Sequence, residues 1–485
     1  MRTGARARSP KAPDRSERID HAGAIAALVE RARAAQRICE TYDQARVDEL
    51  VTAAGWAIVD PEHNRRLAEI AVRDSGLGNV ADKIAKNRRK TIGLLADLRH
   101  AKSVGVIADL PELGLTEIAR PVGVVGAVTP STNPSATPAN NVINALKGRN
   151  AIILAPSPKG HSTAALLLEF VHAELARVGA PRDLVQALAP PVTREATAEL
   201  MRQVDLVVAT GSQTGVRAAY ASGTPAIGVG AGNVVVIVDE TADVTAAAAK
   251  IAASKMFDNA TSCSSENSVI ALEDNYAALK KALVLAGGAV LDARENAQLE
   301  RAMFAGGKLA PPFIAQSAPA IATRAELTRA ALREAGFLIV EETGVGPDHP
   351  FSGEKLSPVL ALYRAPDFAA ASALAERILR HQGAGHSIGL HSKDDARALE
   401  LGLTLPVCRV IVNQAHCFAT GGSFDNALPF SLSMGCGTWG RNSISENLNY
   451  RHFLNITRVV RPLTAARPEP TEAELFGAYR RKYGL

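Results

Sequence analysis

Four short runs of apolar, largely β-branched residues punctuate the middle of the chain, and segments with a helical pattern lie between several of them. The runs cover residues 122–128, 151–155, 206–209 and 234–238, and the helical patterns cover about 162–178 and 216–222. Earlier, from residue 25 to about 101, alanine, leucine and charged residues recur with a helical period. Strands that alternate with helices predict a parallel, doubly wound sheet, so we expect an α/β fold.

Composition sets limits on size and partners. The chain has 485 residues and 47% hydrophobic content, which is enough for two or more domains with large cores. A net charge of +5 with both signs interspersed, and only 4% aromatic residues, argue against nucleic-acid binding. No apolar run has the length of a membrane span, so we expect no membrane partner.

The cysteines are few and widely spaced. They stand at positions 39, 263, 408, 417 and 436, and no CxxC pair occurs. This spacing supports neither a zinc site nor a disulfide framework, so we expect no bound metal. A protein with five unpaired cysteines fits a reducing cytoplasm best.

One of these cysteines lies in an unusual setting. Cys263 is surrounded by small polar residues in the segment 257–267, soon after a helix-like stretch at 246–256. Small neighbours let a substrate carbon approach, and nearby backbone N–H groups can hold a thiolate and an oxyanion. An isolated cysteine is more often a buried structural residue, but the polar flanks favour a nucleophile here.

A second unusual segment covers residues 120–138. The apolar run there ends at Pro130 and Pro134, so the strand should open into a rigid loop. Asn133 lies in this loop, and its side-chain amide could donate a hydrogen bond to an oxyanion. An Asn-Pro turn with only a backbone role explains the same spacing equally well.

Together with the late segment 435–447, these stretches resemble the aldehyde dehydrogenase superfamily. They are similar in particular to its CoA-acylating branch, which includes the aldehyde half of bifunctional aldehyde–alcohol dehydrogenases. The similarity extends from about residue 20 to residue 460. Several matches in the right order are more specific than a single glycine motif.

The resemblance implies an aldehyde-dehydrogenase-like organisation with two doubly wound parallel-sheet domains and a small oligomerisation hairpin. We expect a basic disordered lead-in at 1–19, an NAD(P)-binding domain at 20–238 with a hairpin strand near 103–122, a catalytic domain at 239–440 and a C-terminal segment at 441–485 with an oligomerisation strand. The same resemblance to the family also implies a homodimer or homotetramer. For the lead-in, an alternative is a tail that docks on a microcompartment shell, as in some relatives.

The family mechanism can be carried over residue by residue. Cys263 would attack the aldehyde, while Asn133 and the Cys263 backbone N–H hold the oxyanion. Hydride would pass to NAD or NADP, and coenzyme A would take the acyl group from the resulting thioester. Glu354 matches the glutamate that contacts the nicotinamide ribose, although a solvated carboxylate is its plainer interpretation. His386 resembles a groove histidine that could assist CoA deprotonation, and a structural histidine is the alternative.

Other positions are expected to bind the cofactor. The turn 211–215 lies between a strand and a helix, where N–H groups suit a pyrophosphate, but an ordinary βα turn has the same spacing. The segment 157–161 lacks the acid of NAD-preferring relatives, so we expect NADP to be accepted, unless Lys159 is only a surface charge. The residues expected at the cofactor are Thr129, Pro130, Ser157, Lys159, Gly211, Ser212, Gly215, Gly228 and Glu354.

Gly228 departs from the pattern of hydrolytic relatives. Those enzymes carry a glutamate two residues before a Gly-Gly pair, and it activates water on the thioester. Gly228 occupies the aligned position and cannot accept a proton. The acyl-enzyme should therefore persist until a thiol such as CoA arrives, because a thiolate is already nucleophilic.

The sequence says less about which aldehyde is the substrate than about the reaction. Small residues around Cys263 favour a short aldehyde, and the run 447–457 is similar to acylating sulfoacetaldehyde dehydrogenases. Arg441 and Arg451 are candidates to bind a sulfonate, although structural ion pairs would explain both. Sulfoacetaldehyde is the leading substrate, with acetaldehyde or propionaldehyde as the alternative. A hydrolytic enzyme and a redox-inactive binding relative remain as other classes.

Overall fold

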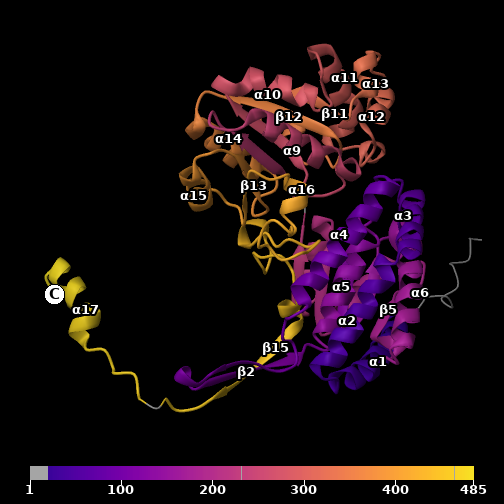
Figure 1. Ribbon diagram of the computed structural model, residues 1–485, viewed down its shortest axis with the longest axis vertical. Coiled ribbons are helices and arrows are strands. Elements are labelled where there is room, and N and C mark those ends of the chain that lie inside the picture. Colours follow the sequence, from indigo (N-terminus) through magenta and orange to yellow (C-terminus); the bar gives the residue numbers. More distant parts are fainter. Residues whose placement is uncertain (1–19, 231, 464) are drawn as a thin grey trace, which may run out of the picture.

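The computed structural model describes residues 20–230, 232–463 and 465–485. Two lobes and a projecting antiparallel sheet make up the molecule, and each lobe is built around one parallel sheet (Figure 1). The expected basic lead-in at 1–19, with its alternative role in shell docking, lies outside the described residues. Among the described helices, none is long and apolar enough to cross a membrane.

The first lobe contains a five-stranded sheet in which all neighbouring strands are parallel. Its order is β5 (Val185–Ala187), β4 (Ala151–Pro156), β3 (Val124–Thr129), β6 (Leu206–Thr210) and β7 (Ala226–Val229). Chain order and sheet order differ, as in a doubly wound sheet. The three apolar runs predicted as strands in this region are confirmed, and the prediction of an α/β fold is confirmed with them.

Within the described residues, eight α-helices belong to the first lobe. They are α1 (His21–Glu40), α2 (Gln44–Val59), α3 (Pro61–Ser75), α4 (Val80–Leu98), α5 (Ala136–Lys147), α6 (His161–Arg177), α7 (Arg194–Gln203) and α8 (Gln213–Tyr220). The helical pattern predicted for residues 25–101 is confirmed, and it corresponds to the four helices α1 to α4. Each begins at a side chain that caps the first turn, namely Asp20, Asp43, Asp60 and Asn79.

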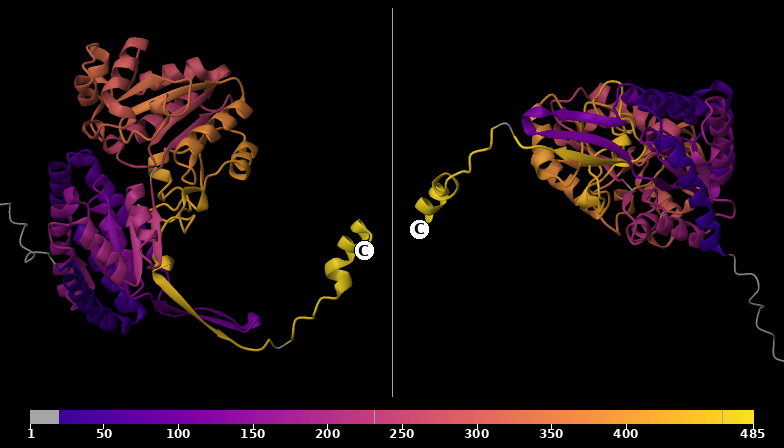
Figure 2. Two further views of the ribbon diagram at one scale, coloured as in Figure 1. Left: turned by 180° about the vertical axis from the view of Figure 1, so that it is seen from behind. Right: turned by 90° about the horizontal axis from the view of Figure 1, so that it is seen from below.

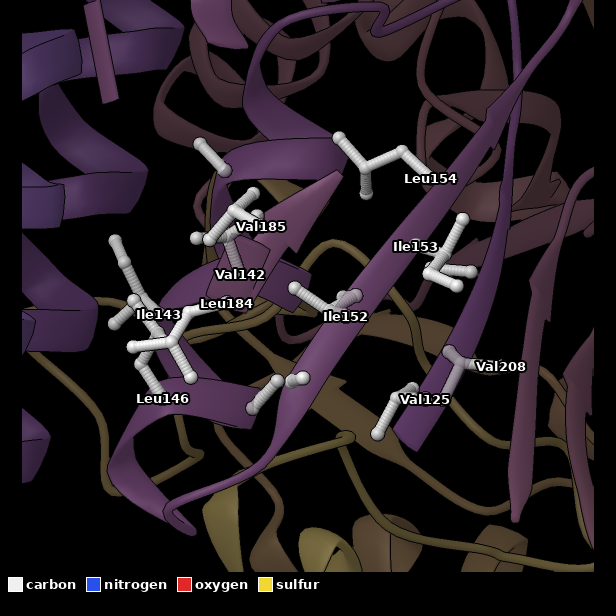
Figure 3. Close-up of a cluster of buried hydrophobic side chains, with 14 of the residues drawn as sticks. Val125, Val142, Ile143, Leu146, Ile152, Ile153, Leu154, Leu184, Val185 and Val208 are labelled. Atoms are coloured by element: carbon white, nitrogen blue, oxygen red, sulfur yellow. The ribbon is translucent and has the colours of Figure 1, made fainter. Parts of the chain in front are cut away.

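Strand β4 lies at the centre of the first core. Ile152, Ile153 and Leu154 are buried on it, with side chains of α5, β3 and β6 nearby (Figure 3). Every residue of β4 is buried. Burial on both faces explains why this strand is a continuous apolar run and not an alternating one.

The second lobe contains a seven-stranded parallel sheet. Its order is β10 (Gly288–Val290), β11 (Phe337–Glu341), β12 (Val359–Ala365), β9 (Glu266–Leu272), β8 (Val234–Val238), β13 (Ile388–His391) and β14 (Val410–Val412). Its helices are α9 (Val244–Met256), α10 (Glu273–Leu285), α11 (Ala293–Met303), α12 (Ala318–Arg324), α13 (Ala330–Glu334), α14 (Phe368–His381), α15 (Asp395–Thr404) and α16 (His416–Ala419).

The placement of β8 corrects the expected boundary at residue 238. We expected residues 234–238 in the first domain, but β8 pairs with β9 and β13 in the second sheet. The chain passes from β7 to β8 within residues 230–233, so the change of lobe occurs there. An apolar run predicts that a segment is a strand, but not which partners it has, and both partners of β8 come later in the chain.

A three-stranded antiparallel sheet projects from the first lobe (Figure 2). β2 (Leu115–Pro121) pairs on one side with β1 (Gly105–Leu110) and on the other with β15 (Leu454–Val460). The predicted hairpin strand near 103–122 and the predicted late strand are both present. Among the described residues, the outer edges of β1 and β15 pair with no further strand.

Beyond β15 the chain continues away from the two lobes to a terminal helix, α17 (Glu472–Tyr483) (Figure 1). Thr471 and Glu474 form a capping box at its start, and Gly484 ends it in the left-handed conformation. None of its residues is buried.

Candidate active site

Cys263 lies between α9 and β9, in the turn that leads into the second sheet. Its Sγ atom is 3.5 Å from Nε2 of His386, and Nδ1 of His386 is 2.7 Å from Oγ of Ser387. When Nδ1 carries the ring proton and donates a hydrogen bond to Oγ of Ser387, Nε2 is unprotonated and can accept the thiol proton. The two predicted residues, 123 positions apart, are therefore in contact.

Burial keeps both groups neutral. It raises the pKa of the Cys263 thiol to about 12, with Glu354 as the next cause, and lowers the pKa of His386 to about 3, with Arg409 as the next cause. At neutral pH the free protein therefore holds a thiol beside a neutral imidazole. Thiolate forms only when the proton passes to an acceptor as the substrate binds.

Gly232 occupies a tight position beside this pair. A Cβ atom at residue 232 would lie 2.5 Å from the carbonyl oxygen of Cys263 and 2.9 Å from Cδ2 of His386. Both distances are shorter than van der Waals contact, so only glycine fits between the two residues. The segment that joins the two sheets thus passes directly against the nucleophile.

Glu354 is close enough to influence Cys263, and one of its oxygens has no partner. Burial raises the pKa of Glu354 to about 8, and a backbone hydrogen bond at Gly232 opposes this shift. Among the described residues, its buried Oε1 atom has no hydrogen-bond partner. A carboxyl oxygen in this state can take up a hydroxyl group of a ligand, such as that of a ribose.

Several of the expected cofactor residues lie at the carboxyl ends of strands of the first sheet. Thr129 and Pro130 stand at the carboxyl end of β3, and the Ser157 N–H donates to the Thr129 carbonyl at 3.0 Å. Among the described residues, the buried Oγ of Ser157 has no partner, whereas Lys159 is exposed. Carboxyl ends of parallel strands form the usual ligand crevice of such sheets. Glu354 comes from the second lobe, between β11 and β12.

The turn 211–215 begins α8. Gly211 has a φ of 144°, and Ser212 caps the helix by accepting from the Gly215 N–H at 3.2 Å. We predicted a helix from residue 216, but it begins at Gln213 because this cap satisfies the first turn. The remaining N–H groups of that turn lie at the N-terminus of α8, just after the carboxyl end of β6.

Gly228 has no room for a side chain. A Cβ atom there would lie 2.6 Å from Cγ1 of Val216 and 3.0 Å from the ring of Tyr220. The Gly228 N–H donates to the Tyr220 hydroxyl at 3.0 Å, and that hydroxyl lies 3.1 Å from the Gly228 carbonyl. Position 228 is therefore packed against α8, and no carboxylate can act from it.

Asn133 lies in the loop between β3 and α5 and is held by a residue that the sequence did not point to. Nζ of Lys86, on α4, donates to Oδ1 of Asn133 at 2.9 Å and to Oδ2 of Asp258 at 2.5 Å. In the sequence, the role of Lys86 was indicated only by two lysines at helical spacing, Lys83 and Lys86. Two lysines at this spacing more often lie on the solvent-exposed face of a helix.

Arg409 is a second residue that sequence reasoning missed. It is 6% exposed and makes four hydrogen bonds of 2.9–3.1 Å. The acceptors are the carbonyl oxygens of His386, Gly435 and Ser445 and Oδ1 of Asn447. The guanidinium thus joins the histidine of the site to the late segment 435–447.

The two arginines considered for sulfonate binding are exposed. Arg441 has a φ of 56°, in the left-handed region, and the guanidinium of Arg451 lies 6.0 Å from the Tyr450 ring centre. Among the described residues, neither side chain forms an ion pair or a hydrogen bond. The described residues also contain no group of three or more His, Cys, Asp or Glu side chains placed to hold a metal.

Comparisons with known proteins agree with one another. A model of the aldehyde dehydrogenase family matches residues 15–291. A sulfoacetaldehyde dehydrogenase (acylating) from Cupriavidus necator is 61% identical over 463 residues, which are 96% of this chain and 94% of that protein. An acetylating aldehyde dehydrogenase from Geobacillus thermoglucosidasius is 34% identical with a TM-score of 0.88, covering 93% of this chain and 99% of that one.

A further solved structure contains ligands. The propionaldehyde dehydrogenase of Rhodopseudomonas palustris, with bound CoA and an acylated cysteine, is 25% identical with a TM-score of 0.80. The similarity covers 90% of this chain and 97% of that one.

Proposed function

The chain belongs to the aldehyde dehydrogenase family, and from this premise we infer that it oxidises a short aldehyde to its acyl-CoA with NAD(P)+ and CoA. The observation that carries the inference is the contact between Cys263 and His386. Position 228, packed against α8, is a glycine with no room for a side chain. A thiol next to a neutral imidazole can form a thioester. With no carboxylate at 228 to activate water, that thioester is passed to a thiol.

Proton transfer follows from the geometry of this contact. The aldehyde binds, and the Cys263 sulfur forms a bond to the aldehyde carbon while its proton passes to Nε2 of His386 in the same step, because the pKa values of the two groups disfavour a separate thiolate–imidazolium pair. The carbonyl oxygen becomes an oxyanion, to which the Asn133 amide and the Cys263 backbone N–H donate. The dinucleotide supplies a hydride acceptor when it is bound, with Glu354 and Ser157 as its expected hydrogen-bond partners.

The second half of the reaction reuses the same residues. His386 first releases the Cys263 proton to solvent. It then accepts the proton of the CoA thiol, and the CoA sulfur attacks the thioester carbon. The oxyanion forms again at the same donors, the bond from Cys263 to the acyl group breaks, and acyl-CoA leaves. The Cys263 thiolate regains a proton from His386, so each cycle releases one proton to solvent together with NAD(P)H.

Sulfoacetaldehyde is the substrate we propose. The identity of 61% to an acylating sulfoacetaldehyde dehydrogenase supports it, and so does the free guanidinium of Arg441. Acetaldehyde and propionaldehyde are the alternatives, since the solved structures that are similar include enzymes named for those reactions.

Arg441→Ala should therefore separate charged from uncharged aldehydes. We expect kcat/KM to fall about 10–100-fold for sulfoacetaldehyde and less than about threefold for acetaldehyde, because a charge-assisted hydrogen bond is worth about 1.5–3 kcal/mol. Both aldehydes are assayed with CoA. Arg458→Ala, which removes an exposed arginine paired with Glu117, is the control. The anion pocket is excluded if acetaldehyde is the better substrate and Arg441→Ala changes neither value.

We also propose that the enzyme is a dimer or a dimer of dimers. The projecting sheet has two unpaired edges, and β14 is an unpaired edge of the second sheet within the described residues. Static light scattering at micromolar concentration should give a mass of at least two chains. A mass near 50.9 kDa, that of one chain, would contradict the proposal. The five free cysteines suit the cytoplasmic location that we propose.

A further inference from the structure

A buried charged cluster lies between α4 and the loop of the nucleophile. Nζ of Lys86 donates to Oδ1 of Asn133, Oδ2 of Asp258 and Oγ1 of Thr261 at 2.9, 2.5 and 2.9 Å. Nζ of Lys83 donates to Oδ2 of Asp258 at 3.1 Å. Lys83, Lys86 and Asp258 are all buried. We call Lys83, Lys86, Asn133, Asp258 and Thr261 the α4 cluster.

The contact with Lys86 determines how the Asn133 amide is oriented. A lysine ammonium can only donate hydrogen bonds, so the amide atom that faces it must be the oxygen Oδ1. Nδ2, the other branch of the same planar amide, must then point away from Lys86. Within the part of the chain that the structure describes, Nδ2 donates to no protein acceptor. It is therefore the group that remains available for an oxyanion.

Asp258 connects the same ammonium to the nucleophile. Asp258, Asn259 and Ala260 follow one another in the left-handed region, with φ of 50°, 50° and 56°, which is costly for residues with a Cβ. The carboxylate stabilises this turn by accepting from Lys83, Lys86, the Thr261 hydroxyl and the Asn79 N–H. Lys86 thus contacts both the oxyanion amide and the turn that ends at Cys263.

The α4 cluster places the ammonium of Lys86 beside Asn133. Burial alone would raise the pKa of Asp258, but Lys86 and Lys83 together lower it, so this carboxyl is ionised. A second acidic side chain, that of Asp82, accepts from the Asp258 N–H at 2.7 Å and lies near Lys83. Burying ions is costly, and a buried set of this kind gives little net stability, so its retention needs another reason. An ammonium hydrogen-bonded to an amide oxygen makes the amide N–H groups stronger donors.

We propose that Lys86 is a positioning residue for acyl transfer: it fixes and polarises the Asn133 amide so that Nδ2 meets the oxyanion. This rests on the role of Asn133 in the proposed function. Lys83 shares Asp258 and the same burial but reaches the Thr132 carbonyl and not Asn133, so it is a matched control.

A double-mutant cycle tests the proposal. The rate of NAD(P)H formation in a single turnover without CoA is measured for the wild type, Lys86→Met, Asn133→Ala and the double variant, with melting temperatures for each. Loss of one oxyanion donor costs about 10²–10³-fold. We expect Lys86→Met to slow the wild type about 10–100-fold but to slow Asn133→Ala less than about threefold, because residues that act together are not additive.

The Lys83→Met control separates an effect on the position of the Asn133 amide from an effect on the stability of the protein. Lys83→Met should lower the melting temperature about as much as Lys86→Met while slowing the reaction less than about fivefold, because it leaves Asn133 in place. If Lys86→Met does not fold, Lys86→Gln is used in the same cycle. The proposal is overturned if Lys86→Met slows both backgrounds equally, or if Lys83→Met slows the reaction as much. A wild type that makes no acyl-CoA would instead contradict the proposed function.

Discussion

Replacing Cys263 by alanine is expected to abolish aldehyde oxidation. The sulfur atom forms the bond to the substrate, and no neighbouring group can replace it, so kcat/KM should fall by at least about 10⁴-fold. Without CoA, the wild type should release one equivalent of NAD(P)H per active site in a burst and then stop, whereas Cys263→Ala should show no burst. Absorbance at the nicotinamide band records both.

Cys408→Ala is the control for this prediction, because Cys408 is free and only partly buried. It should keep the burst at full amplitude. Activity of Cys263→Ala within about tenfold of the wild type, a loss of less than about 1.4 kcal/mol in transition-state stabilisation, would show that the nucleophile lies elsewhere. Steady turnover without CoA would show a hydrolytic enzyme.

Arg409→Met is expected to have the largest effect on stability. The guanidinium is buried and serves four acceptors, and a buried acceptor that loses its partner costs about 1–3 kcal/mol. Allowing for water that enters the space, the free energy of unfolding should fall by about 3–5 kcal/mol. Calorimetry should show a melting temperature that is lower by about 5 °C or more.

An exposed ion pair provides the contrast. Arg364 lies 3.1 Å from Glu273, and both side chains are more than half exposed. Arg364→Met should therefore change the free energy of unfolding by less than about 1 kcal/mol. If the two variants melt at the same temperature, the hydrogen bonds of Arg409 do not hold the loop around His386 in solution.

The sequence was sufficient for β3, β4 and β6 of the first sheet, but not for the short strands β5 and β7 or for the pairing partners of β8. Fully buried parallel strands are apolar throughout, so a continuous apolar run such as 151–155 can be recognised as a strand from the sequence. Partnership depends on residues elsewhere, and β8 was therefore assigned to the wrong sheet. The start of α8 was missed by three residues because the pattern of apolar residues begins later than the Ser212 cap.

The residues that sequence reasoning missed share one property. Lys86 meets Asp258 across 172 positions, and Arg409 meets Asn447 across 38. A buried lysine and a buried arginine look like surface charges in a sequence, because their type is mostly exposed. Cys263 and Asn133 were predicted as site residues because their local context is unusual. Lys86 and Arg409, which contact Asn133 and the His386 carbonyl, have ordinary neighbours in the sequence.

The neutral state of Cys263 also bears on how long the enzyme survives. Peroxides and alkylating agents attack thiolates much faster than thiols, so the desolvation that raises the pKa of the partly exposed Cys263 to about 12 slows these reactions in the free protein. The proton leaves only during catalysis. We therefore expect the resting enzyme to be durable under oxidative stress and chemical damage to accumulate with the number of turnovers, not with elapsed time.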